Sequence, residues 1–353
     1  MTTRRANVVG TGLIGGSIGL ALRREGFHVT GDDVEPQRVQ RAIEVGALDA
    51  AGLDADAEIT FVAVPVGSIP EAARRALELS AGAVTDVGSV KASVVAAVDD
   101  PRFVGGHPMA GSEQEGVEGA DTDLFEGAVW VLTPTAATDD AAFTLVRSVV
   151  SSLGADVVAL PPARHDALVA VVSHVPHLTA ATLMHLADER AEEHRALLRL
   201  AAGGFRDMTR VAAGHPGIWP DICAENRDAI VESLDRLIDG LRDMRTAVAG
   251  ADRDALLAVL ERAHLARRNL PARVARPDEL CEVRVPVQDR AGVLADVTTL
   301  AAELDVSIAD LEIAHSSEGD RGVLILLVPA ERTERFQGGL LARGYRPAVR
   351  PLA

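Results

Sequence analysis

The first 160 residues of the chain alternate short apolar runs, rich in β-branched side chains, with longer stretches in which apolar residues recur every three or four positions. The short runs are typical of buried strands, and the longer stretches are typical of amphipathic helices. The predicted strands span residues 6–9, 27–30, 59–64, 83–85, 103–104, 129–132 and 157–160. Strands that alternate with helices indicate a mostly parallel, doubly wound sheet. We therefore predict a Rossmann-like α/β domain over residues 1–162.

The pattern changes after Pro161 and Pro162, where apolar positions follow a period near 3.6 and β-branched alternation nearly disappears. This periodicity predicts an all-helical domain over residues 163–272. The predicted helices span residues 164–189, 195–200, 218–249 and 252–266, and the third can be broken. A helical block of this size beside a nucleotide-binding domain often supplies a substrate wall and a subunit interface, so we expect a homodimer.

The C-terminal part, residues 280–353, returns to strand patterns after a linker flanked by Pro271 and Pro277. Its pattern predicts a strand at 281–287, a helix at 292–304, strands at 306–313 and 323–328, a helix at 331–341 and a strand at 345–349. The order βαββαβ is that of a small ferredoxin-like domain.

The composition is that of a packed globular protein, with 48% hydrophobic and 25% charged residues among 353. A chain of this length exceeds one hydrophobic core of ordinary size, which indicates two or three domains. The 52 acidic and 35 basic residues give a formal net charge of −17, which repels nucleic-acid phosphates and anionic membranes. We therefore expect neither a nucleic acid nor a membrane as a partner.

Two further features indicate a soluble protein of a reducing compartment. Cys223 and Cys281 lie far apart and provide neither a disulfide framework nor a metal-binding spacing. The apolar run after Arg4 and Arg5 is interrupted by glycines and lacks a cleavage pattern, unlike a secretory signal. No other stretch reaches the roughly 18 uninterrupted apolar residues of a membrane span. We expect a cytoplasmic protein without a bound metal.

A glycine-rich motif follows the first predicted strand and opens the first predicted helix: Gly10-Thr11-Gly12-Leu13-Ile14-Gly15. Glycines at these places allow a tight turn, close approach of a pyrophosphate and strand–helix packing, and the helix N-terminus offers N–H donors to the anion. Asp33 lies 21 residues beyond Gly12, where a carboxylate bonds a ribose diol and repels a 2′-phosphate. NAD is therefore the predicted cofactor, and we add Val64 and Pro65, at the end of the third predicted strand, as contacts.

Two other interpretations of this segment are open. The motif could be a glycine-rich turn that binds nothing. The letters GGSIG at residues 15–19 also match the nucleophile elbow of α/β hydrolases. An elbow serine must lie on the strand-to-helix turn itself, whereas Ser17 falls well inside the predicted helix. A helix-packing role for Ser17 is therefore favoured.

A histidine occupies a second loop that follows a predicted strand, in the segment GGHPMAGSE at residues 105–113. Ligands of doubly wound domains collect at the carboxyl ends of the strands, and a histidine there can take a proton at neutral pH. The segment DVGSVK at residues 86–91 supplies another polar loop after an earlier strand and ends in Lys91, the only lysine of the chain. We therefore select His107 as the candidate base, although a lone histidine is often only a hydrogen-bonded loop residue.

The helical region carries two further polar clusters. The first is SHVPH at residues 173–177, where Pro176 disturbs helical geometry and no acidic or cysteine pattern completes a metal site around His174 and His177. Substrate contact is the favoured interpretation. The second is GGFRDMTR at residues 203–210, which presents Arg206 and Arg210 on a glycine-loosened turn. Guanidinium groups suit carboxylate substrates, although either arginine alone could lie on a solvated face.

With these motifs in order over nearly the whole chain, the sequence resembles the prephenate/arogenate dehydrogenase family of tyrosine biosynthesis. The motifs that carry the resemblance are GTGLIGGSIGLAL, DVGSVK, HPMAGSEQEGV, SHVPH, GGFRDMTR and WPDI followed by Glu225-Asn226. The segment DRAGVL at residues 289–294 similarly looks like the ligand-binding turn of an ACT regulatory domain.

The resemblance implies the NAD-dependent oxidative decarboxylation of prephenate. His107 would accept a hydrogen bond or proton from the ring hydroxyl while the adjacent carbon gives a hydride to NAD, and loss of carbon dioxide restores aromaticity. Ser89 would steady the hydroxyl and His107, and Arg210 would hold a substrate carboxylate. The side-chain end of the substrate would be lined by Ser112, Glu113, Ser173 and His177.

The resemblance leaves the substrate and the role of the C-terminal domain open. Arogenate, whose amino-acid side chain could meet Glu113, is the alternative to prephenate, which we favour. An aromatic amino-acid effector would contact Asp289, Gly292, Val293 and Leu294. The domain could instead only reinforce oligomerisation by pairing sheet edges.

Two functions outside this family are alternatives. A β-hydroxyacid or imine dehydrogenase should carry a catalytic lysine in its helical domain, where this chain has none. A non-enzymatic, amino-acid-sensing regulator would leave the His107 and Arg210 motifs without a role.

Overall fold

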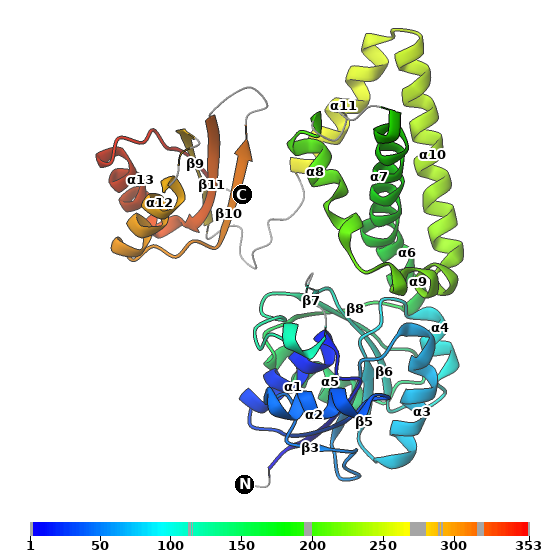
Figure 1. The fold of residues 1–353 in the computed structure, drawn as a ribbon. Helices are drawn as coiled ribbons and strands as arrows, with labels where there is room; N and C mark the ends of the chain where they lie inside the picture. Colours follow the sequence, from blue (N-terminus) through cyan, green and yellow to red (C-terminus); the bar gives the residue numbers. More distant parts are fainter. Residues whose placement is uncertain are drawn as a thin grey trace. The chain divides into compact units, whose positions relative to one another are not determined.

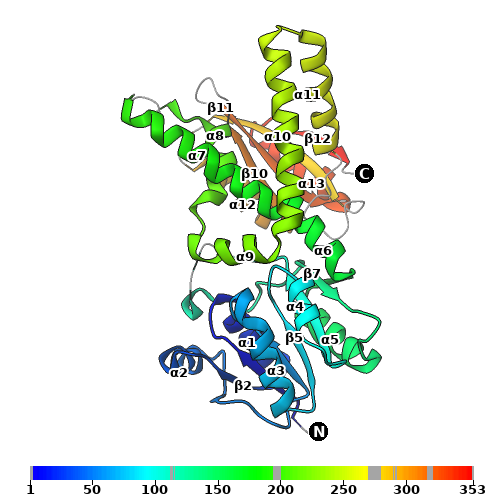
Figure 2. The same ribbon diagram turned by 90° about the vertical axis from the view of Figure 1, so that its right-hand side faces the viewer.

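The computed structural model describes residues 3–111, 114, 116–193, 200–268, 280–288, 290, 292–315 and 321–351. The chain divides into two compact units. The first consists of Met1–Leu186 and Thr209–Leu241, and the second of Ala187–Met208 and Arg242–Ala353. Each unit has its own sheet (Figures 1 and 2). Each also has its own hydrophobic core.

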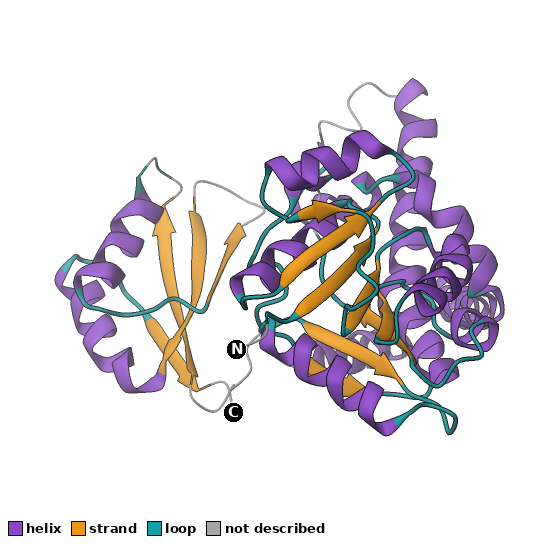
Figure 3. Ribbon diagram, turned by 90° about the horizontal axis from the view of Figure 1, so that it is seen from below, coloured by secondary structure: helices purple, strands orange, loops and turns teal. Residues whose placement is uncertain are grey.

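An eight-stranded sheet forms the centre of the first unit (Figure 3). Its strands are β1 (Arg5–Val9), β2 (His28–Asp32), β3 (Ala50–Ala51), β4 (Ile59–Val62), β5 (Ala83–Asp86), β6 (Phe103–Pro108), β7 (Val129–Thr133) and β8 (Asp156–Ala159). Their spatial order is β3-β2-β1-β4-β5-β6-β7-β8, and every neighbouring pair is parallel except β6 with β7. The predicted mostly parallel sheet is confirmed.

Helices cover both faces of this sheet. They are α1 (Leu13–Arg24), α2 (Pro36–Glu44), α3 (Ile69–Leu79), α4 (Ala92–Ala97) and α5 (Asp140–Ser152). Successive strand residues point to opposite faces, and Phe61 and Val62 of β4 accordingly belong to two different cores. Ile18 of α1 packs in the core that contains Phe61, and Ile69 of α3 packs in the core that contains Val62. The sheet is therefore doubly wound.

Two strand ends differ from the prediction. Strand β4 ends at Val62, so Val64 and Pro65 lie in the loop that follows it. Strand β6 continues through His107 and Pro108 because its last residues pair with β7, with His107 opposite Val131. The prediction that His107 lies in a loop was wrong, and its backbone is held in the sheet.

The helical region confirms the predicted all-helical pattern, with different boundaries. Its elements are α6 (Pro162–Val169), a π-helical turn (Ala170–His174), α7 (Val175–Glu193), α8 (Gly203–Thr209), 3-10 turns at Arg210–Ala213 and Pro216–Ile218, α9 (Trp219–Glu225), α10 (Arg227–Ala249) and α11 (Arg253–Arg268). Asn226 separates α9 from α10, which is the predicted break. The predicted helix at 195–200 lies outside the described residues apart from Leu200.

The helical stretch Pro162–Arg190 is long and apolar enough to cross a membrane by length and composition, although charged and polar residues interrupt its apolar run. The core helix of a soluble protein can pass the same test. Within this stretch, His165 and Asp166 are buried and hydrogen-bonded to each other.

The second unit contains a four-stranded antiparallel sheet. Its elements are β9 (Leu280–Gln288), α12 (Val293–Glu303), β10 (Asp310–His315), β11 (Arg321–Pro329), α13 (Thr333–Ala342) and β12 (Ala348–Pro351), with the strand order β10-β11-β9-β12. Val297 of α12 and Phe336 of α13 pack against Val283 and Leu326 of the sheet. The predicted βαββαβ order is confirmed, although β10 begins at Asp310 and not at 306, and β12 begins at Ala348 and not at 345.

Candidate active site

The three motif glycines after β1 each meet a different steric demand. Gly10 has a φ of +92°, and its N–H donates to the Asp32 carbonyl at 2.8 Å. A Cβ on Gly15 would lie 1.9 Å from the carbonyl oxygen of Gly10, so only glycine lets α1 start this close to the turn. At Gly12, by contrast, no described atom lies within 4 Å of the place a Cβ would take. Space is therefore left open at the one glycine where the backbone can approach a ligand.

The first turn of α1 is suited to an anion. Gly12 is the N-cap and provides no side-chain acceptor, so the N–H groups at the start of the helix, which begins with Leu13 and Ile14, have no capping side chain. No acidic residue lies in that first turn. Unsatisfied N–H groups and the positive end of the helix dipole favour a phosphate. The turn thus fits the pyrophosphate of a dinucleotide.

Asp33 lies beside this turn. Its Oδ2 accepts hydrogen bonds from the backbone N–H of Thr11 at 2.8 Å and from the Thr11 hydroxyl at 3.1 Å. Its neighbour Asp32 is instead paired with Arg75 at 2.9 Å. The Val64 side chain lies next to Gly10, 3.0 Å from the place a Cβ would take there. The carboxylate that sequence spacing predicted for the ribose is therefore adjacent to the glycine turn.

A buried ion pair joins the ends of β5 and β6. The Lys91 ammonium pairs with the Asp86 carboxylate and donates to the Gly106 carbonyl at 2.8 Å, and both charged side chains are fully buried. Asp86 also accepts the N–H groups of Gly106 at 3.0 Å and of Gly88 at 2.8 Å. Burial lowers the pKa of Lys91, and the Asp86 charge opposes that shift. These bonds tie the loop that carries Ser89 to the strand that carries His107.

His107 is the first member of a chain of three side chains. Its Nδ1 lies 2.9 Å from Nε2 of His165, and Nδ1 of His165 lies 2.8 Å from Oδ1 of Asp166. The Asp166 carboxylate also accepts the N–H groups of Lys91 and Ala92, both at 2.8 Å. Hydrogen bonds therefore connect His107, near the carboxyl end of β6, to α6, the first helix of the helical region.

The pKa of His107 is lowered well below 6.5, first by burial and then by His165, Lys91 and His174. A histidine with a depressed pKa is neutral at pH 7, which is the form that can accept a proton. The arrangement can therefore perform general base chemistry at the edge where a dinucleotide would bind.

The helical histidines make separate contacts. The Nδ2 of Asn226 lies 3.2 Å from Nδ1 of His174 and donates to the Asp166 carbonyl at 2.9 Å. Burial lowers the pKa of His174 to about 4. His177 stacks on Trp219, with ring centroids 3.6 Å apart, and burial lowers its pKa as well. Both histidines thus have defined contacts with neighbouring side chains.

The sequence-predicted residues fall into four groups. The first group lies at or just beyond the carboxyl ends of β1, β4, β5 and β6, at one edge of the sheet. It consists of the glycine turn, Val64, Pro65, Ser89 and His107. Ser173 lies in the π-helical turn that precedes His177. Arg210 is exposed and begins the 3-10 turn that leads to Gly214. A Cβ built on Gly214 would lie 3.7 Å from the His177 ring.

The remaining candidates are not part of this cluster. Gly292, Val293 and Leu294 lie at the start of α12 in the second unit, where Gly292 has a φ of +89°. Ser112, Glu113 and Asp289 lie outside the described residues.

Sequence reasoning missed His165 and Asp166, and it gave Asn226 no role. The pair stands eight residues before the SHVPH motif, and only its proximity to that motif could have drawn attention to it. Their partner His107 is 58 residues away in the chain, which no local pattern reveals.

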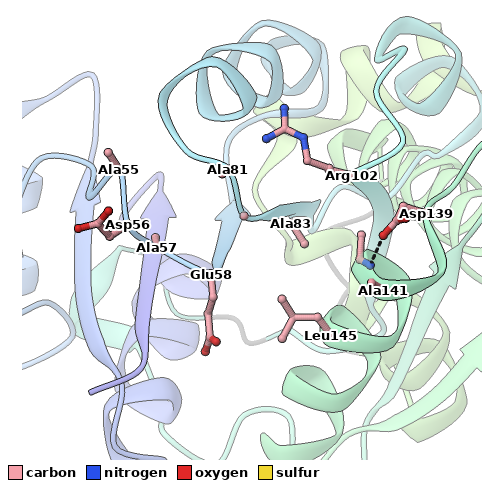
Figure 4. A pocket seen from close by; sticks show the side chains of 12 residues that line it. Ala55, Asp56, Ala57, Glu58, Ala81, Ala83, Arg102, Asp139, Ala141 and Leu145 are labelled. Atoms are coloured by element: carbon pink, nitrogen blue, oxygen red, sulfur yellow. Dashed lines mark hydrogen bonds between the residues drawn. The ribbon is translucent and has the colours of Figure 1, made fainter. Parts of the chain in front are cut away.

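A cavity of about 560 Å³ lies at the opposite edge of the sheet, where β4 and β5 begin (Figure 4). Arg102, the one basic side chain among its described lining residues, is already bonded to Asp100 and to the carbonyls of Ser80 and Leu77. Ligands of doubly wound folds bind at the carboxyl ends of the strands. The cavity is therefore not the candidate site.

A doubly wound sheet that carries a pyrophosphate-type turn and a neutral histidine at one edge is the arrangement of a dinucleotide-dependent dehydrogenase. Residues 18–159 match the family model of the prephenate dehydrogenase nucleotide-binding domain, and residues 161–262 match that of the prephenate dehydrogenase dimerization domain. The chain belongs to the prephenate dehydrogenase family.

Individual relatives agree with this assignment. The chain is 34% identical to the prephenate dehydrogenase of Bacillus subtilis, over 90% of each chain. Its fold matches the crystal structure of prephenate dehydrogenase from Aquifex aeolicus in complex with hydroxyphenyl propionate and NAD+, with a TM-score of 0.71 and 30% identity over 76% of this chain and 98% of that one. It also matches the crystal structure of Synechocystis arogenate dehydrogenase, with a TM-score of 0.66 and 32% identity over 74% of this chain and 98% of that one. The family resemblance seen in the sequence is confirmed.

Proposed function

We propose that the chain catalyses the NAD-dependent oxidative decarboxylation of prephenate to 4-hydroxyphenylpyruvate. The observation that carries the proposal is the position of a neutral His107 at the same sheet edge as the glycine turn. NAD, when bound, supplies the acceptor for the hydride. The glycine turn, Leu13, Ile14, Asp33, Val64 and Pro65 hold the cofactor at this edge.

His107 acts on the substrate as the base. It accepts the proton of the ring hydroxyl as the carbon that bears this hydroxyl loses its hydride. Carbon dioxide then leaves, its bonding electrons make the ring aromatic, and the phenolate oxygen takes the proton back. Ser89, on the loop fastened by Lys91 and Asp86, orients the hydroxyl. The buried ion pair keeps this loop in place, so Ser89 and His107 both approach the oxygen of the ring hydroxyl.

The carboxylates of the substrate need cationic partners. Arg210 binds one of them, because a guanidinium matches a carboxylate in two parallel hydrogen bonds. Ser173 and His177, with Ser112 and Glu113, line the side-chain end. This division leaves His107 free for the ring hydroxyl.

Arogenate is the second candidate substrate, because one structural neighbour is an arogenate dehydrogenase. The deciding experiment follows NADH absorbance with prephenate and arogenate side by side. We expect prephenate to have the higher kcat/KM, and a ratio at least tenfold in favour of arogenate would reverse the assignment. No NADH from either substrate would refute both.

The organisation of the chain follows from the same proposal. Residues 1–162 form the NAD-binding domain, 163–272 the substrate and dimerisation domain, and 280–353 an ACT-like regulatory domain, in a cytoplasmic homodimer. The βαββαβ order and the left-handed Gly292 at the start of α12 support the regulatory part, because a helix N-terminus after such a turn can hold an amino-acid carboxylate. An aromatic amino acid is the proposed effector, with Gly292, Val293, Leu294 and Asp289 as its contacts.

A further inference from the structure

The hydrogen bonds that link His107, His165 and Asp166 run in one donor-to-acceptor direction, which is set by the Asp166 carboxylate. The Asp166 side chain accepts two backbone N–H groups, from Lys91 and Ala92. Both carboxylate oxygens therefore act as acceptors, Oδ1 for Lys91 and Oδ2 for Ala92. The contact of 2.8 Å between Asp166 and Nδ1 of His165 therefore requires the hydrogen to be on that nitrogen.

This assignment then determines which nitrogen carries the hydrogen in each imidazole ring. An imidazole ring with this single hydrogen has a lone pair on Nε2. That nitrogen lies 2.9 Å from Nδ1 of His107, which must be the donor. A neutral His107 with its hydrogen on Nδ1 has its lone pair on Nε2. The ring nitrogen that faces away from His165 is thus the basic one.

We propose that His165 and Asp166 are positioning residues that hold His107 in the Nδ1–H tautomer, so that its Nε2 is the base of the reaction. The proposal rests on the function proposed above for His107. The same arrangement steadies the ring when it gains a proton, because Nδ1–H then donates to an acceptor backed by a carboxylate.

The other groups around His107 do not provide this direction. The Lys91 ammonium, from the loop after β5, is a donor that is already used by Asp86 and the Gly106 carbonyl. His174, from the π-helical turn, contacts Asn226 through Nδ1. Among the described contacts, only His165 lies within hydrogen-bonding distance of His107.

His165 is the better residue to test, because Asp166 also caps the start of α4. Replacing Asp166 would disturb the backbone of Lys91 and Ala92 as well as the histidine. His165, which is 1% exposed, has its two ring nitrogens engaged by His107 and Asp166 alone among the described residues. Two variants separate shape from hydrogen bonding. His165→Phe fills the space without an acceptor, whereas His165→Gln supplies an amide with one acceptor and one donor.

The first experiment reads the tautomer directly in the enzyme without substrate. The protein is labelled with 15N-histidine, and the His107 signals are identified by their loss in His107→Gln. We expect Nδ1 to be protonated and Nε2 to be unprotonated in the wild type, and this preference to be lost in His165→Phe. A protonated Nε2 in the wild type, or an unchanged tautomer in His165→Phe, would overturn the proposal. Because no turnover is needed, this test holds even if the proposed substrate is wrong.

The second experiment measures the consequence for turnover. We expect His165→Phe to lower kcat by about 10²-fold, the lower end of the usual effect of a general base, with KM and NAD affinity changed less than threefold. His165→Gln should recover at least tenfold of this loss. The matched control is His28→Phe, at the opposite edge of the same sheet, which should keep wild-type kcat. The proposal fails if His165→Phe retains kcat within threefold, or if His165→Gln is no better than His165→Phe.

Discussion

The protonation of His107 sets the acid limit of the proposed reaction. Burial lowers its pKa, and His165, Lys91 and His174 lower it further. A base is active when it is unprotonated, which is the case above its pKa. A depressed pKa therefore extends the active range toward acid, beyond that of an ordinary histidine.

Replacement of His107 tests whether it is the base. We expect His107→Asn to lower kcat by about 10²–10⁴-fold, since asparagine cannot accept the proton, while NAD affinity is unchanged. In the wild type, kcat/KM should stay level from neutral pH to below pH 6.5 and should fall at more acid pH. Wild-type turnover in the variant, or an acid limb at or above pH 6.5, would contradict the assignment.

Arg210 is the second test at this scale. Removing the cationic partner of a substrate carboxylate commonly costs about 2–5 kcal/mol of binding. Arg210→Ala should therefore raise KM by more than tenfold and leave the dissociation constant of NAD unchanged. Arg206→Ala is the control, since Arg206 comes from the same motif. If KM rises in the control and not in Arg210→Ala, the carboxylate belongs to Arg206.

In the turn between β1 and α1, one glycine is needed for folding and another for cofactor binding. A Cβ on Gly15 would collide with the Gly10 carbonyl, whereas a Cβ on Gly12 would meet no described atom within 4 Å. Gly15→Ala should therefore destabilise the protein, as thermal unfolding would show. Gly12→Ala should keep the melting temperature but bind NAD at least tenfold more weakly in calorimetry, because its methyl group fills the space left for the pyrophosphate. Equal NAD affinity in Gly12→Ala and the wild type would place the cofactor elsewhere.

Most elements could be predicted from the sequence, because buried strands and amphipathic helices carry their period in local residues. The extension of β6 through His107 could not be predicted, since it comes from antiparallel pairing with β7. The π-helical turn at Ala170–His174 likewise leaves no mark on a 3.6-residue pattern. The motifs identified the histidine and the glycines of the candidate site. They could not reveal His165 and Asp166, whose importance arises only when α6 packs against the sheet edge.

For the complete chain, a regulatory role of the βαββαβ unit can be distinguished experimentally from a structural one. Regulation requires a second site whose binding energy is coupled to the first. We expect the activity of the full chain to respond to one of tyrosine, phenylalanine and tryptophan, and a variant that ends before β9 to lose at least part of that response.

The shortened protein must first be shown to fold, by its melting temperature and NAD affinity. Inhibition by tyrosine that persists in it belongs to the active site. Identical responses of the two proteins to all three amino acids would leave the domain a structural role only.

The buried Lys91 also makes the chain its own reporter of unfolding. It is the only lysine in the sequence, and its side chain is fully enclosed at the junction of β5, β6 and α6. A protease that cleaves only after lysine therefore has a single target, the bond between Lys91 and Ala92, and reaches it when this core opens. Digestion should yield two fragments, residues 1–91 and 92–353, at a rate that follows the opening of the nucleotide-binding fold and decreases when NAD binds.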